Sequence, residues 1–200
     1  MRRAPRWLLL LLIPIVLGLG LFAFDFPRPA TDDMAPTLRK GDVLLACRLC
    51  GGPDRGDVVV FADPEEKGHL SIRRVIGAPG DRVEVHDGHV RVNGVPLVDE
   101  AAGHVPMPGL DSGIGKGDFE LIDETVGAHH FHVVTDPGLT QSGDRPSQML
   151  NDEFFLMADR RTLAHDSRDY GPIPAREIRS LVKRVIHSGD GDGTRQRSVP

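Results

Sequence analysis

Residues 82–92 read Arg-Val-Glu-Val-His-Asp-Gly-His-Val-Arg-Val. Valine alternates with charged or polar side chains on both sides of Asp87-Gly88, which is the pattern of two half-buried strands. The Asp-Gly pair supplies the residues that a tight hairpin turn requires. Asn93-Gly94 then turns the chain again. This stretch therefore predicts a β-hairpin and a mainly β fold.

Compact apolar runs on either side of the hairpin predict further strands. They span residues 43–46, 57–61 and 153–157, and Gly-Asp pairs bound the first two. Short apolar runs between turn signals are typical of strands in a buried sheet. The runs therefore add three strands to the prediction.

The region from about 100 to 150 is rich in Gly, Pro, Asp and His, and only residues 130–135 there predict a strand. We interpret this region as an insertion rather than a second domain with its own core. Residues 175–186 have the spacing of an amphipathic helix, while 181–186 fit a closing strand equally well. The tail at 188–200 predicts disorder.

The N-terminus has the pattern of a membrane anchor. Arginines at positions 2, 3 and 6 precede residues 7–24, which carry no charge and are almost wholly apolar. A helix of this length spans about 27 Å, close to the hydrocarbon core of a bilayer. A cleaved secretory signal is the alternative, but no small-x-small site follows the run. By the positive-inside bias, residues 1–6 stay cytoplasmic and a β domain at 27–187 lies across the membrane.

Composition narrows the expected partners and cofactors. The net charge is -5 and the arginines are scattered, so we expect no nucleic acid partner. Cys47 and Cys50 predict a short-loop disulfide in an oxidising compartment. A redox or metal element is the alternative, but the distant His129, His130 and His132 match no standard zinc spacing. We therefore expect no metal and no cofactor.

Three segments of the chain carry a family resemblance. The first reads Pro-Ala-Thr-Asp-Asp-Met-Ala-Pro-Thr-Leu at 29–38 and is followed by Gly41-Asp42. The second reads Ile-Arg-Arg-Val-Ile-Gly-Ala-Pro-Gly-Asp at 72–81. The third joins Met-Ala-Asp-Arg-Arg at 157–161 to Asp-Ser-Arg at 166–168. In this order the segments resemble bacterial type I signal peptidases, the membrane-anchored serine proteases that remove signal peptides from exported proteins.

The resemblance implies a curved antiparallel β fold behind the anchor. It also implies an apolar groove near the membrane, where an extended peptide pairs with exposed strands as an added strand. The expected partners are signal peptides or exported preproteins, with the lipid bilayer around residues 7–24. The expected location is the bacterial cytoplasmic membrane, with a single span and the globular domain outside the cytoplasm.

The residues that carry out the family's chemistry are replaced. By the resemblance, the nucleophilic serine stands directly before Met34 and the general-base lysine directly before Arg74. This chain has Asp33 and Arg73 at those positions. The serine that supports the lysine corresponds to Ala164.

Other positions keep the family's pattern. Thr31 has a hydroxyl where the resemblance places a donor for the oxyanion. Asp166 and Arg168 keep the charged pair that braces the site, and Met34 and Pro36 belong to the framework around the nucleophile position. The resemblance therefore implies an intact framework around an altered centre.

The replacements remove the expected mechanism. Arg73 cannot act as the base, because arginine keeps its proton in proteins. As a nucleophile, Asp33 would form a mixed anhydride from an unactivated amide, with no evident acid to help the amine leave. No serine occurs between the anchor and Ser71, so a shifted alignment does not restore the dyad. We predict an ion pair between Asp33 and Arg73, and the alternative chemistry is a proton shared by Asp33 and Asp166.

The sequence thus predicts a signal-peptidase-like membrane protein that binds extended export segments without cutting them. The first alternative is an active signal peptidase with altered active-site chemistry. The second is a Cys-x-x-Cys redox or metal-binding module.

Overall fold

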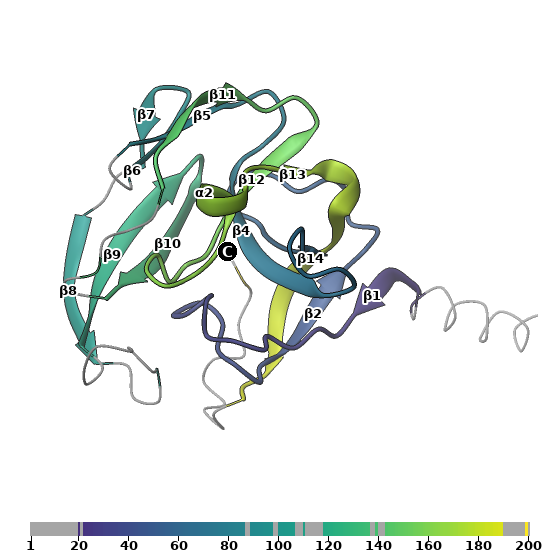
Figure 1. Ribbon diagram of the computed structural model, residues 1–200. Coiled ribbons are helices and arrows are strands. Elements are labelled where there is room, and N and C mark those ends of the chain that lie inside the picture. The colour runs from purple at the N-terminus through teal and green to yellow at the C-terminus, as the bar shows by residue number, and fades with distance from the viewer. Residues whose placement is uncertain are drawn as a thin grey trace, which may run out of the picture.

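The computed structural model describes residues 20, 22–86, 89–97, 100–106, 110, 118–136, 139, 143–189 and 199. Within these residues the fold is mainly β, as the sequence predicts, and its strands form three antiparallel sheets (Figure 1). Two short helical elements are described beside them, α2 (Ser167–Tyr170) and the 3-10 turn η1 (Ala175–Glu177).

A seven-stranded sheet carries the segments that build the site. In spatial order its strands are β1 (Phe24–Asp25), β2 (Val43–Cys47), β14 (Ile178–His187), β3 (Val58–Ala62), β4 (Leu70–Gly77), β12 (Glu153–Met157) and β13 (Ile173–Pro174). The predicted strands at 43–46, 57–61 and 153–157 are β2, β3 and β12, within one residue at each end. In β3, Val58 and Val60 pack into one apolar cluster, while Val59 and Phe61 pack into another. Burial on both faces explains why this strand is a continuous apolar run.

The predicted hairpin is present in a second sheet. In spatial order its strands are β11 (Arg145–Met149), β5 (Arg82–His86), β6 (His89–Val92) and β7 (Val95–Pro96). His86 pairs with His89 across the hairpin, and the turn residues Asp87 and Gly88 lie outside the described residues. Asn93 has a φ of 56°, as the second predicted turn requires. The alternating valines of β5 and β6 all point into one buried cluster.

The region at 100–150 holds more strands than its sequence predicts. β8 (Glu100–Pro106), β9 (Asp118–Val126) and β10 (His129–Thr135) form the third sheet, and β11 joins the hairpin. The expectation of a single strand at 130–135 was therefore wrong. In β9 a buried acid, Glu124, takes a core position because it pairs with Arg161, and this hides the apolar alternation. Val126, Phe131 and Val133 pack with the hairpin valines in one cluster.

Of the two alternatives for residues 175–186, the structure has the strand and not the amphipathic helix. After η1, β14 runs between β2 and β3 and pairs with both. Leu181 and Val182 are buried in the clusters on the two faces of the sheet. Of the tail predicted to be disordered, residues 188–189 and 199 are described, and the Gly189 N–H donates to Asp42 at 2.9 Å.

The predicted anchor lies mostly outside the described residues. Gly20, Phe22 and Ala23 are helical, but Phe24 belongs to β1 and pairs with Cys47. Within the described residues, no helix is both long enough and apolar enough to cross a bilayer.

Candidate functional site

The segment that holds Asp33 lies over one face of the seven-stranded sheet. Met34 and Leu38 are buried against Val60 and Ile72 of β3 and β4. The Arg160 N–H donates to the Asp33 carbonyl at 2.8 Å. Apolar packing and this backbone hydrogen bond hold the Asp33 backbone in place and so fix the position of its side chain.

The predicted ion pair between Asp33 and Arg73 is present. Arg73 Nη2 lies 2.9 Å from Asp33 Oδ2, and the two side chains are 29% exposed for Asp33 and 9% exposed for Arg73. The same guanidinium donates to the Ile72 carbonyl at 2.8 Å and to the His165 carbonyl at 2.8 and 3.2 Å. Nε, Nη1 and Nη2 of Arg73 each have an acceptor, so the side chain is held in place as a cation.

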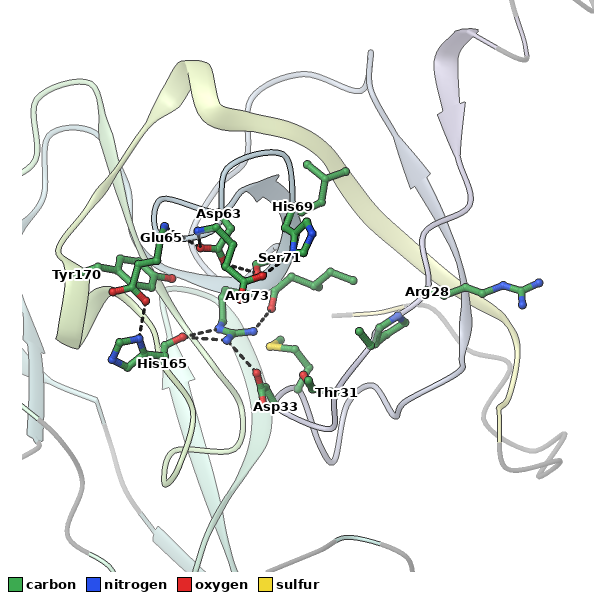
Figure 2. A pocket seen from close by; sticks show the side chains of 16 residues that line it. Arg28, Thr31, Asp33, Asp63, Glu65, His69, Ser71, Arg73, His165 and Tyr170 are labelled. Atoms are coloured by element: carbon green, nitrogen blue, oxygen red, sulfur yellow. Dashed lines mark hydrogen bonds and ion pairs between the residues drawn. The ribbon is translucent and has the colours of Figure 1, made fainter.

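A pocket of about 410 Å³ opens beside this ion pair. Figure 2 shows Arg73 between Asp33 and His165, with Glu65 next to His165. Four of the predicted site residues come together in its wall: Thr31, Asp33, Met34 and Arg73. Five other predicted residues do not line the pocket, namely Pro36, Arg74, Ala164, Asp166 and Arg168.

Sequence reasoning missed the other polar residues of the pocket. They are Arg28, Asp63, Glu65, Glu66, His69, Ser71, His165 and Tyr170. Most of them belong to the loop between β3 and β4 or to the strand end that follows it. The run Asp-Pro-Glu-Glu at 63–66, directly after a buried strand, was the one available signal.

Asp63 remains ionised at the edge of the pocket. Burial alone raises the pKa of Asp63, but four interactions outweigh burial and lower it. The Ser71 hydroxyl donates to this carboxylate at 2.6 Å, and the N–H groups of Glu65 and Glu66 donate at 2.9 and 3.1 Å. The positive charge of Arg73 acts in the same direction. The pocket thus holds a second negative charge near the guanidinium.

His165 links Arg73 of β4 to the acidic loop at 63–66. Its carbonyl accepts from Arg73, and its ring Nδ1 lies 2.7 Å from Glu65 Oε2. The hydrogen bond to Glu65 raises the pKa of His165, burial opposes it, and the charges of Asp169, Glu65 and Asp166 raise it further, so that the pKa is raised overall. The neighbouring Tyr170 stays protonated, because burial raises the pKa of its phenol.

We expect His165 to stabilise the fold more at acidic than at alkaline pH. Its pKa is raised in the folded state, so its contribution is complete below the unfolded value of about 6.5 and is lost as pH rises through the higher folded pKa. The effect is small, because the ring is largely exposed and solvent screens the pair. His165→Gln should therefore cost more unfolding free energy at about pH 5.5 than at about pH 8. Exposed His187 provides the matched control, and an equal pH response of His165→Gln and His187→Gln would contradict this assignment.

Arg74 faces the core instead of the pocket. Its Nε and Nη2 donate to the two oxygens of Asp159 at 2.8 and 2.6 Å, and its Nη1 donates to the Gly56 carbonyl at 2.8 Å. The guanidinium also stacks 4.1 Å from the centre of the Phe131 ring. Thr37 donates to Asp159 and accepts from Arg74. This buried network ties β4 to the segment that carries Asp33.

Asp166 and Arg168 form a second buried pair. Asp166 caps the N-terminus of α2, and Arg168 donates to both of its oxygens at 2.9 and 2.8 Å. Burial raises the pKa of Asp166, but the charge and hydrogen bonds of Arg168 and the Ala158 N–H outweigh it and leave the pKa lowered. Asp166 is fully buried outside the pocket. Its oxygens are thus engaged away from Asp33, which does not favour a shared proton.

The two cysteines close a short loop at the end of β2. Cys47 and Cys50 are joined by a disulfide, with a Cα–Cα distance of 5.7 Å. His129, His130 and His132 lie on β10, where His130 contacts Thr125. In the part of the chain that the structure describes, no group of three or more His, Cys, Asp or Glu residues has the arrangement of a metal site.

Comparison with known proteins places these features in a family. The family model described as "Signal peptidase, peptidase S26" matches residues 4–187. "Probable signal peptidase I-1" of Synechocystis is 38% identical over 183 residues, which cover 84% of this chain and 75% of that protein. "Signal peptidase I V" of Bacillus subtilis is 28% identical over 152 residues, covering 74% and 77% of the two chains.

Two further matches differ in how much they cover. "Signal peptidase I" of Pseudomonas aeruginosa is 29% identical over 171 residues, and the match spans 77% of this chain but 58% of that protein. A crystal structure of a signal peptidase I from Enterococcus faecalis is 22% identical, with a TM-score of 0.37, over 66% of this chain and 97% of that one. On the family model and the Synechocystis relative, this chain belongs to the signal peptidase S26 family.

Proposed function

We propose that this signal-peptidase-like protein binds extended segments of signal peptides or exported proteins and does not cleave them. The observation that carries the proposal is the ion pair of Asp33 and Arg73, which stand where the resemblance places the family's serine and lysine. A protease of the Ser-Lys type needs a hydroxyl and a neutral amine at these positions. Here a carboxylate and a permanent cation neutralise each other.

The surroundings of the ion pair support the loss of cleavage. Arg73 is bound to two carbonyls as well as to Asp33, so it is a fixed structural cation. Ala164 is buried and offers no hydroxyl, at the position where the resemblance places the family's supporting serine. Turnover would require a base, and an arginine does not supply one because it keeps its proton in proteins.

The pairing of β4 supports binding. Residues Leu70–Arg73 pair with β3 on one side, whereas β12 pairs with β4 only from Arg74 onward. Among the described strands, this part of β4 therefore has one edge without a partner strand, and the pocket lies along it. An open strand edge accepts an extended peptide through backbone hydrogen bonds. Because Arg73 already occupies the Ile72 carbonyl, we expect the bound segment to pair beside Leu70 and Ser71.

The proposal also covers the membrane topology of the chain. Residues 7–24 would anchor the chain in the bacterial cytoplasmic membrane by a single span, with residues 1–6 in the cytoplasm. The pocket would then face the extracytoplasmic surface of the bilayer, where export segments emerge. The sequence pattern of arginines before an uncharged apolar run supports this orientation.

The proposal predicts binding without turnover. The full chain in detergent should bind a fluorescent signal-peptide substrate, while mass spectrometry detects no cleavage products over the same period. Asp33→Ala should likewise show no cleavage, because Asp33 does not act as a nucleophile. Asp32→Ala is the matched control, since Asp32 is the adjacent carboxylate and pairs with Arg39 instead. Cleavage by the parent that disappears in Asp33→Ala and persists in Asp32→Ala would overturn the proposal.

A further inference from the structure

Tyr170 lines the pocket beside the ion pair, and its hydroxyl is not used within the described part of the protein. The residue is the last of α2, and its ring packs partly buried against the apolar cluster that contains Phe154 and Ile173. Figure 2 shows the hydroxyl turned toward the side of Arg73. Among the described residues, no hydrogen bond joins this hydroxyl to another group. The phenol is therefore available to a ligand in the pocket.

The contacts around Tyr170 restrict its side chain before any ligand binds. The Tyr170 N–H donates to the Asp166 carbonyl at 3.2 Å. The His165 ring meets the phenol ring edge-on, with the two ring centres 6.2 Å apart. Arg145 Nε donates to the Arg168 carbonyl at 2.8 Å, which ties the same helical turn to β11. A side chain held in this way loses little conformational freedom on binding.

The charges around the phenol make it a neutral hydrogen-bond donor. Burial raises the pKa of Tyr170, and the charge of Arg73 acts against burial. The negative charges of Asp166, Asp63 and Glu65 raise the pKa further. The hydroxyl therefore keeps its proton at ordinary pH. The same carboxylates disfavour an anionic acceptor, so the acceptor that fits is an uncharged oxygen such as a backbone carbonyl.

Two neighbouring donors of the pocket are already engaged within the protein. Arg73 donates to Asp33 and to two backbone carbonyls, and the Ser71 hydroxyl donates to Asp63. Tyr170 differs from both, because its donor is free among the described residues. A segment that pairs with the open edge of β4 would therefore find this hydroxyl without a competing partner.

We propose that Tyr170 donates a hydrogen bond to a backbone carbonyl of the bound segment and is a specificity-determining residue of the pocket. This inference rests on the proposed function and adds the group that holds the segment. A contact with the backbone does not depend on the side chain at that position, so the pocket accepts segments of different sequence. A helical segment is disfavoured, because its carbonyls already accept hydrogen bonds within the helix.

The test is binding of a fluorescent signal peptide to the full chain in detergent, measured by fluorescence anisotropy. Tyr170→Phe should weaken binding about fivefold, the effect of one hydrogen bond between neutral groups. Its thermal unfolding temperature without peptide should stay equal or rise, because the variant removes a hydroxyl with no partner among the described residues. Thr125→Val is the matched control, because it removes a hydroxyl outside the pocket, and it should bind as the parent does.

A second set of peptides identifies the acceptor. Each peptide has one backbone amide replaced by an ester, whose carbonyl is a weaker hydrogen-bond acceptor. One of these esters should bind the parent less tightly than the unmodified peptide does. The same ester should bind Tyr170→Phe as tightly as the unmodified peptide does, because the hydrogen bond is already absent from that variant.

The outcomes separate this inference from the proposed function. Equal binding by the parent and Tyr170→Phe would overturn the inference alone, as would ester peptides that lose the same affinity for both proteins. A parent chain that binds no signal peptide would overturn the proposed function together with the inference. A parent chain that cleaves the peptide, and binds it more tightly than Tyr170→Phe does, would overturn the proposed function alone.

Discussion

Asp159→Ala is expected to lower the free energy of unfolding by about 3–5 kcal/mol, the cost of removing one partner from a buried ion pair. Asp159 and Arg74 are both fully buried, and two hydrogen bonds join their side chains. Without the carboxylate, the Arg74 cation would stay in the core beside neutral groups such as the Gly56 carbonyl, the Thr37 hydroxyl and the Phe131 ring. These groups do not replace the lost negative charge.

The measurement is thermal unfolding of the full chain in one detergent. For a chain of this size the loss corresponds to a shift on the order of 10 °C. Asp33→Ala is the internal control, because it removes the partner of the neighbouring Arg73, whose ion pair is partly open to solvent. That variant should cost about 1 kcal/mol or less. Equal shifts in the two variants would contradict the difference in burial on which the prediction rests.

The strands that the sequence predicts correctly are those whose two faces or one face are purely apolar. β3 is apolar throughout, and the hairpin alternates valine with polar residues without exception. In both cases the apolar positions of the sequence are the buried positions of the strand, so the pattern predicts it correctly. β9 was missed because Glu124 occupies a buried position, and the partner that permits this, Arg161, lies 37 residues further along the chain. When a charged residue is buried through an ion pair with a distant segment, the local sequence pattern does not predict its strand.

The two adjacent arginines show a second limit of the sequence. The family resemblance implies that Arg73 stands at the base position, but it does not indicate which way the side chain points. Successive strand residues point to opposite faces, so Arg73 reaches Asp33 at the pocket while Arg74 enters the core. The His165 carbonyl and the acidic loop at 63–66 reach the same pocket only through the fold, and no spacing in the sequence indicates that contact.

Cleavage is expected to appear when the family's residues are restored. The triple variant Asp33→Ser, Arg73→Lys and Ala164→Ser supplies a nucleophile, a base and the supporting hydroxyl. It should cleave a signal-peptide substrate that the parent leaves intact, and the positioned general base should contribute about 10²–10⁴-fold to the rate. The matched control keeps Arg73 and changes only Asp33 and Ala164 to serine. It should remain inactive, because a serine beside a permanent cation has no group to take its proton.

The pH dependence of the triple variant follows from the charges that remain around position 73. A lysine there begins near a pKa of about 10.4; burial of this position lowers the value, while the ionised Asp63 raises it. The cleavage rate should therefore rise with pH through an alkaline pKa, where the amine becomes neutral. Adding Asp63→Asn removes the nearby negative charge and should move that pKa, and with it the rate profile, to lower pH. If the triple variant cleaved but Asp63→Asn did not move its rate profile, the lysine introduced at position 73 would not be the base. If the triple variant bound the substrate and left it uncut at all pH values, the site would have lost more than the dyad.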